Sequence, residues 1–97
     1  MEDKRRQIEE ELIETLASEG KIRILRMLAE NPTRFYTAYA VRKRTGLRRQ
    51  DANKILNKLV ELGWIKQHAY GVKKYQINLD KKEVKHLVEF FKAVEAI

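Results

Sequence analysis

The sequence predicts a mainly α protein with a small β hairpin. Apolar residues recur every three or four positions through five stretches, which is the spacing of one buried helix face. Near residues 75–79, by contrast, apolar and polar residues alternate as in a half-buried strand. One proline and four glycines separate these stretches. A length of 97 residues fits one domain.

The first two helices are expected over residues 2–17 and 21–30. The first carries an apolar stripe on an otherwise acidic helix, made by Ile8, Leu12, Ile13 and Leu16. Ser18 is of a residue type that caps helix N-termini, so it is expected to cap the second helix. The pair Asn31-Pro32 ends that helix, because a residue before proline avoids helical backbone angles.

A tight turn is expected between the third and fourth helices. Residues 34–36 form a short extended piece, and Thr37 caps a third helix over residues 38–44. Gly46 takes the left-handed conformation that ends many helices. The fourth helix covers residues 49–62 and ends at Gly63, with a buried stripe of Ala52, Ile55, Leu56, Leu59 and Leu62.

Two strands, residues 64–70 and 72–79, follow and meet near Gly71. The inward-facing side chains expected for this hairpin are Ile65, Tyr75, Ile77 and Leu79. Asp80 and Glu83 have the spacing of a capping box, which predicts a last helix from residue 80 onward. Three core helices and a two-stranded hairpin form a winged helix-turn-helix core over residues 19–79. Residues 1–18 and 80–97 add a flanking helix on each side within the single domain 1–97.

The formal charge of +7 is concentrated in the middle of the chain. Residues 31–79 hold eleven basic and two acidic side chains, whereas residues 1–20 hold three basic and seven acidic ones. A solubilising surface usually mixes both signs, so a basic segment between less basic flanks indicates a polyanion-binding module. Double-stranded DNA is the partner that this arrangement predicts.

Two stretches resemble known winged-helix regulators. Residues 16–28 resemble the opening of the ArsR family, in which a break precedes a helix with the pattern R-x-x-I-L-x-x-L; Lys21 or Arg23 stands where that family has its arginine. The positions shared with both the ArsR and MarR families are Gly46, Leu47, Leu56, Leu59, Gly63 and Ile65. The resemblance covers residues 16–79 and implies a transcriptional regulator. In size, composition and flanking helices the chain also resembles small archaeal or archaeal-virus winged-helix proteins.

The recognition-helix pattern points to a polar face on the helix over residues 49–62. Its candidate DNA-binding residues are Arg48, Arg49, Gln50, Asn53, Lys54, Asn57 and Lys58. Arg49 suits guanine, and Gln50 or Asn53 suits adenine, in the major groove. Arg48, Lys54 and Lys58 are expected on phosphates, which position a protein without specifying sequence. The competing interpretation is an ordinary solvated helix face.

Other candidate contacts lie outside that helix. They are Arg42, Lys43 and Arg44 at the end of the third helix, and Tyr70, Lys73 and Lys74 near the tip of the wing, the hairpin over residues 64–79. The wing is expected on the phosphate backbone or in the minor groove. Cations also favour any helix C-terminus, and lysines keep a hairpin soluble, so structural roles remain open for both sets. Trp64 is expected to pack, whereas Tyr36 and Tyr39 fit either the core or the backbone contact.

The flanking helices have apolar surface beyond what one buried face needs. We expect them to pair in a homodimer through Ile8, Leu12, Leu16, Leu87, Phe90, Phe91 and Val94. Such a dimer would set two recognition helices about 34 Å apart, facing successive major grooves. The alternative is that each helix covers only its own domain.

Several functions are disfavoured by what the sequence lacks. It contains no cysteine, and His68 and His86 stand far apart, so neither a metal site, a cofactor nor an enzyme is expected. It has no apolar run of about 20 residues and no signal-peptide pattern, so a cytoplasmic, nucleoid-associated protein is expected. A sequence-specific regulator is the leading hypothesis. The alternatives are a non-specific architectural DNA-binding protein and a winged helix used for protein interaction.

Overall fold

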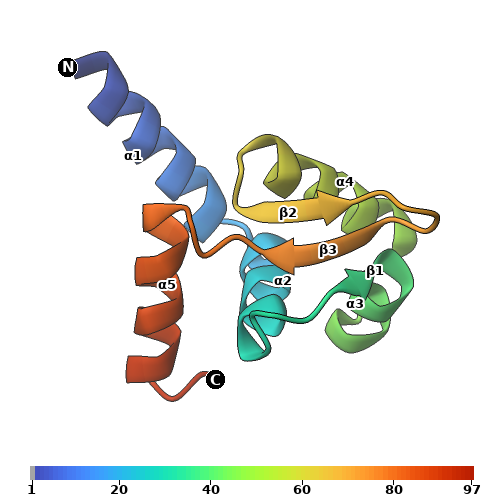
Figure 1. Ribbon diagram of the computed structural model, residues 1–97. Coiled ribbons are helices and arrows are strands. Elements are labelled where there is room, and N and C mark those ends of the chain that lie inside the picture. The colour runs from blue at the N-terminus through green and yellow to red at the C-terminus, as the bar shows by residue number, and fades with distance from the viewer. Residues whose placement is uncertain (1) are drawn as a thin grey trace.

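The computed structural model describes residues 2–97, apart from the side chains of Glu2, Asp3 and Leu16. Within this range the helices and strands follow the expected order (Figure 1). They are α1 (Glu2–Leu16), α2 (Glu19–Glu30), β1 (Tyr36–Thr37), α3 (Ala38–Thr45), α4 (Arg49–Glu61), β2 (Ile65–His68), β3 (Lys74–Ile77) and α5 (Lys82–Ala93). No helix in the described part is long and apolar enough to cross a bilayer.

Short polar side chains fix where α2 and α3 begin, as the sequence predicts. The Ser18 hydroxyl accepts a hydrogen bond from the backbone N–H of Lys21, and the Thr37 hydroxyl accepts one from the N–H of Ala40. Each bond satisfies a donor that the first helical turn leaves free. At the other end of α3, Gly46 has φ +75° and its N–H donates to the carbonyl of Arg42. The turn at Gly46, which sets the direction of α4, therefore has the conformation expected from the sequence.

The sheet has three antiparallel strands in the order β1-β3-β2, so the short extended piece expected near residue 36 joins the hairpin. Tyr36 of β1 lies opposite Tyr75, and Ile65 of β2 lies opposite Ile77. The hairpin strands are also shorter than expected, and residues 69–73 form a five-residue loop between them. β3 is thereby the central strand, bonded to a neighbour on each side.

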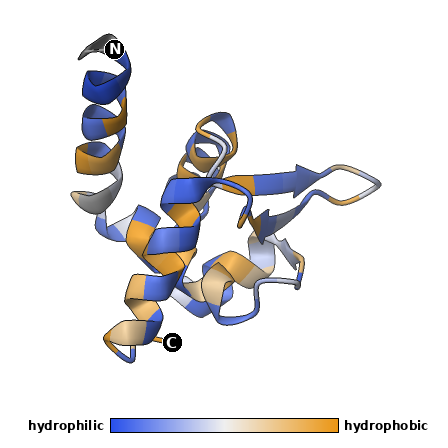
Figure 2. Ribbon diagram, turned by 60° about the vertical axis from the view of Figure 1, so that its left-hand side comes forward, coloured by the Kyte–Doolittle hydropathy of each residue, from blue (hydrophilic) through white to orange (hydrophobic). Residues whose placement is uncertain are grey.

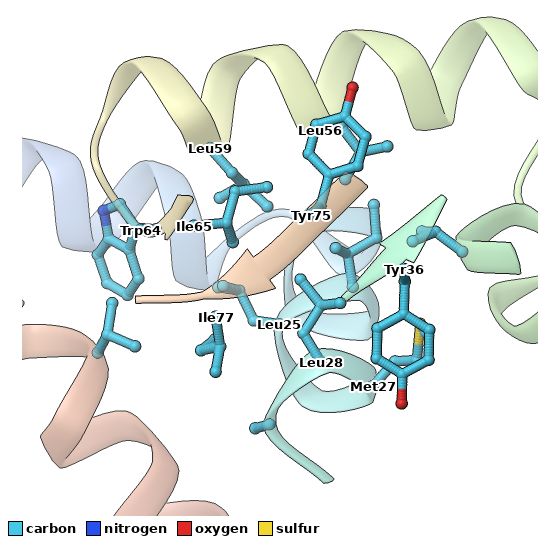
Figure 3. Packing of buried hydrophobic residues seen from close by; sticks show 14 of the residues in the cluster. Leu25, Met27, Leu28, Tyr36, Leu56, Leu59, Trp64, Ile65, Tyr75 and Ile77 are labelled. Atoms are coloured by element: carbon cyan, nitrogen blue, oxygen red, sulfur yellow. The ribbon is translucent and has the colours of Figure 1, made fainter. Parts of the chain in front are cut away.

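The core lies between the sheet and helices α2, α4 and α5 (Figure 3). Leu25 and Leu28 of α2 meet Leu56 and Leu59 of α4, and Trp64 closes one end. These side chains are fully or almost fully buried, so each contributes roughly 1.5–3 kcal/mol by leaving water. The expected packing role of Trp64 is confirmed.

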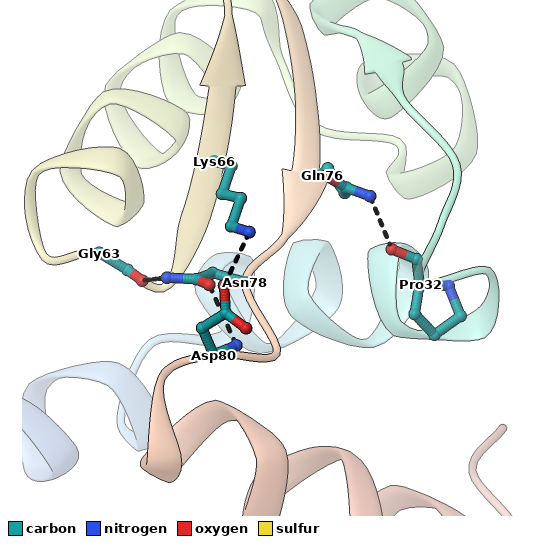
Figure 4. A network of polar contacts seen from close by, with 6 residues as sticks. All are labelled: Pro32, Gly63, Lys66, Gln76, Asn78 and Asp80. Carbon is teal, nitrogen blue, oxygen red and sulfur yellow. Dashed lines mark hydrogen bonds and ion pairs between the residues drawn. The ribbon is translucent and has the colours of Figure 1, made fainter.

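The capping box expected at the start of α5 is wrong. The N-cap is Lys81, which makes no side-chain capping bond. Asp80 instead receives a 3.0 Å bond from Lys66, and its N–H donates to the Asn78 side chain (Figure 4). The Asn78 amide also donates to the carbonyl of Gly63 at 2.8 Å. This network ties the base of the hairpin to the end of α4, and it leaves Leu79 exposed rather than in the core as expected.

Helix α1 is joined to the body through its C-terminal half. The indole N–H of Trp64 donates to Glu11, and Lys81 pairs with the same carboxylate at 3.4 Å. One turn later, Lys21 of α2 pairs with Glu14 at 3.0 Å. The N-terminal turns project away from the body, on the side opposite the tip of the hairpin (Figures 1 and 2). Polar contacts to α2 and to the residues directly before β2 and α5 therefore set the direction of α1.

Candidate nucleic-acid interface

The outer face of α4 is polar along its length. Its inner face is fixed by Ala52, Leu56 and Leu59, whose side chains are fully buried. Because a helix repeats every 3.6 residues, the side chains opposite these three point to solvent. The exposed set contains Arg49, Gln50, Asn53, Lys54 and Asn57, together with Arg48 at the N-cap. All six are candidates that the sequence named.

A groove brings this face next to the hairpin. It has a volume of about 430 Å³ and runs between α3, α4 and the loop over residues 69–73. Its lining residues are Thr37, Ala38, Tyr39, Asn53, Asn57, Val72, Lys73 and Tyr75. Two amides from α4 and one lysine from the loop thus share one surface, which we call the wing groove. Its donors match those that contact base edges and phosphates.

Tyr39 is a member of this surface that sequence reasoning left undecided. Its side chain is 62% exposed. The charged ends of Arg42 and Lys43 lie 5.7 and 5.9 Å from its ring centre. Tyr36, by contrast, is buried in the core. Of these two tyrosines, Tyr39 is therefore the one placed to contact a ligand in the wing groove.

Arg44 lies elsewhere, although it follows Lys43 directly. Its guanidinium stands 5.3 Å from the ring centre of Tyr36, on the side of α3 that faces α2. There it lines a separate groove of about 380 Å³ with Arg23 and Arg26. The structure therefore groups Arg42 and Lys43 with Tyr39, and sets Arg44 apart.

The opposite flank of α4 carries both signs of charge. A groove of about 760 Å³ lies between α4 and the junction of α1 and α2, and its lining includes Asp51, Lys54, Lys58, Glu14 and Lys21. The hydrogen bond from Lys21 lowers the pKa of Glu14, its charge lowers that pKa further, and the charge of Lys58 adds to this. Lys58 is half-buried here, whereas Arg48 and Lys54, the other candidate phosphate contacts on this helix, are exposed. Asp51 sits in the first turn of α4, where an acid favours the helix dipole.

The tip of the hairpin is fully solvent-accessible. Tyr70 is 97% exposed, and Lys73 and Lys74 are exposed as well. Lys74 opens β3 and lies opposite both Thr37 and His68. All three side chains named from the sequence therefore stand at or beside the tip.

The two histidines lie apart from the wing groove and from each other. His68 packs edge-on against Phe35, with ring centres 4.3 Å apart, and His86 stands 3.5 Å from Glu89 on α5. Within the described part of the chain, no three histidine, aspartate or glutamate side chains are arranged to hold a metal ion.

These features define a winged-helix protein: α3, a tight turn and α4 form the helix-turn-helix, and the β2–β3 hairpin is the wing. The sequence model of the MarR family matches residues 15–72, which is more than half of the chain. The protein therefore belongs to the MarR family and is a transcriptional regulator. The fold class and the family resemblance expected from the sequence are confirmed.

A solved structure has the same fold. It is the crystal structure of a predicted DNA-binding transcriptional regulator from E. coli, similar to this chain with a TM-score of 0.76. The match covers 95% of this chain and 94% of that chain at 19% sequence identity, so the likeness shows the fold alone. No curated protein matches the chain. The resemblance to small archaeal or archaeal-virus proteins stays a prediction.

Proposed function

We propose that the protein binds double-stranded DNA, with α4 in the major groove and the wing on the backbone or in the minor groove. The observation that supports this most is the wing groove, where Asn53 and Asn57 face the same space as Lys73. Phosphate binding alone does not require amides, whereas an asparagine can make the bidentate contact that identifies adenine. The wing groove thus favours a sequence-specific regulator over a non-specific architectural protein.

Base reading belongs to the first two turns of α4 in this proposal. Arg49 is the candidate for a bidentate contact to guanine, and Gln50 and Asn53 are candidates for adenine. Arg48, Lys54, Arg42 and Lys43 are exposed or partly exposed around them and are assigned to phosphates. Lys58 and Arg44 are secondary candidates, because one faces Glu14 and the other faces α2.

A binding selection on random duplexes with the purified protein, at two salt concentrations, tests the proposal. A recovered sequence motif is expected, with affinity that falls steeply as salt rises because several phosphates are contacted. Binding without a motif would mean an architectural role. No duplex binding at low salt would leave the protein-interaction alternative.

Variants of α4 then distinguish residues that read bases from residues that bind phosphates. Arg49→Ala or Asn53→Ala should cost about 1–3 kcal/mol on the selected site and relax preference at one base position. Lys54→Ala should weaken all duplexes alike and reduce the slope of log affinity against log salt by about 1. Lys85→Ala is the matched control, because Lys85 is an exposed lysine on α5. If Arg49→Ala leaves discrimination unchanged, α4 does not read bases as proposed.

We also propose that the protein acts as a homodimer through α1 and α5. Exposed apolar side chains gather on these two helices: Ile13 on α1, and Phe90 and Val94 on α5 or its C-cap. An apolar hollow on α1, lined partly by Ile8 and Leu12, adds to this surface. Leu87 is partly buried, and the side chain of Leu16 lies outside the described residues. Phe91 is buried in the chain's own core. It therefore supports the helix that carries the interface and does not itself contact the partner.

A further inference from the structure

The loop at the tip of the wing exposes apolar side chains. Tyr70 is 97% exposed and Val72 is 67% exposed. Gly71 between them has φ +71°, a conformation that side-chain-bearing residues rarely adopt and that allows the chain to turn here. A single exposed apolar residue needs no explanation, but two at the same projecting turn form a small contact surface.

The strands behind this loop hold it in a defined direction. β3 is paired on both edges, and Tyr75, one residue after Lys74, is buried in the core. The hairpin extends beyond the helices on one side of the molecule (Figure 2). The sheet therefore fixes the base from which the loop projects.

The loop also lies beside the face of α4 that the proposed function places on DNA. Val72 and Lys73 line the wing groove together with Asn53 and Asn57. A duplex that takes α4 in its major groove presents the neighbouring minor groove to the wing. The positive charges of Lys73 and Lys74 would then lie against the phosphates that border this groove.

We propose that Tyr70, backed by Val72, inserts as an apolar wedge between base pairs from the minor groove and bends the duplex. Minor-groove proteins use apolar wedges of this kind to unstack a base step and kink the duplex by about 20–90°. A phosphate contact would need only the two lysines, so it leaves the apolar pair unexplained. Pyrimidine–purine steps unstack most easily, so one is expected at a fixed distance from the motif that α4 reads. This inference rests on the proposed function.

The test uses a 30-base-pair duplex recovered from the random-duplex selection. Dyes at its two ends report bending by energy transfer, and 2-aminopurine at the expected step reports unstacking. Wild type and Tyr70→Phe should both bend the duplex and raise 2-aminopurine fluorescence. Tyr70→Ala and Tyr70→Lys, measured at saturation, should leave the duplex straight and stacked, although Tyr70→Lys adds a positive charge. Leu79→Ala, an exposed apolar residue near the opposite end of the hairpin, should bend like wild type.

Three results would overturn the wedge. In the first, wild type binds the duplex and leaves it straight. In the second, Tyr70→Ala bends it as wild type does. In the third, Tyr70→Lys matches wild type in bending while Tyr70→Ala does not, which would assign the tip to phosphate. A wild-type protein that binds no duplex at low salt would instead remove the proposed function, and the wedge with it.

Discussion

At the scale of single residues, Lys21 shows how the fold treats a buried charge. Its side chain is only 9% exposed, yet it stands at the N-terminal end of α2. Removing an ammonium group from water is costly unless a partner compensates for the lost hydration. Glu14 is that partner at 3.0 Å, and it is itself half in solvent. The pair therefore couples the position of α1 to the burial of Lys21.

This pair predicts a pH dependence of stability. The hydrogen bond and charge of Lys21 hold the pKa of Glu14 below its ordinary value of 4.5. A lowered folded-state pKa gives stability that is complete above about pH 4.5 and is lost as pH falls through the folded value. Glu14→Gln should therefore lower the free energy of unfolding at neutral pH and flatten its loss below pH 4.5. Urea unfolding between pH 3 and 7 measures both.

Glu10→Gln is the control for this experiment. Glu10 is exposed on the same helix and makes no ion pair with other described residues. Its variant should keep the acid-limb slope of wild type. Equal slopes for wild type and Glu14→Gln would show that the pair does not contribute.

Hydrophobic periodicity could not decide which of two tyrosines near the start of α3 faces the core. Tyr36 and Tyr39 flank the Thr37 cap, and the sequence allows either to face the core. The structure buries Tyr36, because β1 joins the sheet opposite Tyr75, and it leaves Tyr39 exposed. That pairing is a contact between segments nearly 40 residues apart, so no local pattern reports it. By contrast, the polar face of α4 follows from local spacing alone.

At the scale of elements, Gly46 sets the angle between α3 and α4. A Cβ atom added there would have no atom within 4 Å beyond its two chain neighbours, so the φ of +75° is what opposes alanine. Gly46→Ala should therefore cost about 1 kcal/mol of unfolding free energy through backbone strain. Because the same turn sets the direction of α4, the loss of DNA-binding free energy should exceed the loss of unfolding free energy. Thermal unfolding and duplex binding measure the two effects.

Gly46→Asn serves as the matched variant, since asparagine tolerates the left-handed region better than alanine does. It should recover most of the stability that Gly46→Ala loses. If both variants are equally unstable, crowding rather than backbone conformation is responsible.

Element ends were the part of the fold that the sequence predicted least well. The pattern of Asp80 and Glu83 predicts a capping box, but Lys66 on β2 draws the Asp80 carboxylate to itself. The Asn78 side chain bonds the N–H of Asp80 and the carbonyl of Gly63, so the turn at residues 78–80 is set before α5 begins. A cross-strand lysine competes here with a local cap, and local rules do not weigh that competition.

At the scale of the whole molecule, the apolar surface of α1 and α5 lies on a different side from the basic surface of α4 and the wing. The exposed apolar residues of α1 and α5 gather away from the hairpin tip, whereas the basic candidates line α4 and the wing (Figure 1). A dimer formed through the first surface leaves the second free in both copies. The distribution of charged residues along the chain predicted the basic segment. The burial of Phe91, by contrast, follows only from how the helices pack.

The adjacent residues Phe90 and Phe91 separate dimerisation from folding. Phe90 is 58% exposed and Phe91 is 6% exposed. Phe91→Ala should cost about 3–5 kcal/mol of unfolding free energy by opening a core cavity. Phe90→Ala should change monomer stability by less than about 0.5 kcal/mol, yet weaken self-association roughly tenfold or more.

Sedimentation equilibrium measures association, and denaturant unfolding at low protein concentration measures folding without the contribution of the dimer. Val94→Ala, another exposed position on the same flank, should act like Phe90→Ala. A monomeric wild type, or a Phe90→Ala protein that associates normally, would contradict the proposed interface.

The bond between Trp64 and Glu11 has a consequence for observing the protein. Trp64 is the chain's one tryptophan, so its fluorescence comes from a single place. The indole is buried in the core, while its N–H reaches a carboxylate on α1 and Lys81 stands 6.0 Å from its ring centre. Any shift of α1 changes the charges around this ring and thereby the wavelength of its fluorescence emission. The fluorescence of Trp64 therefore reports the position of α1 in the unlabelled protein.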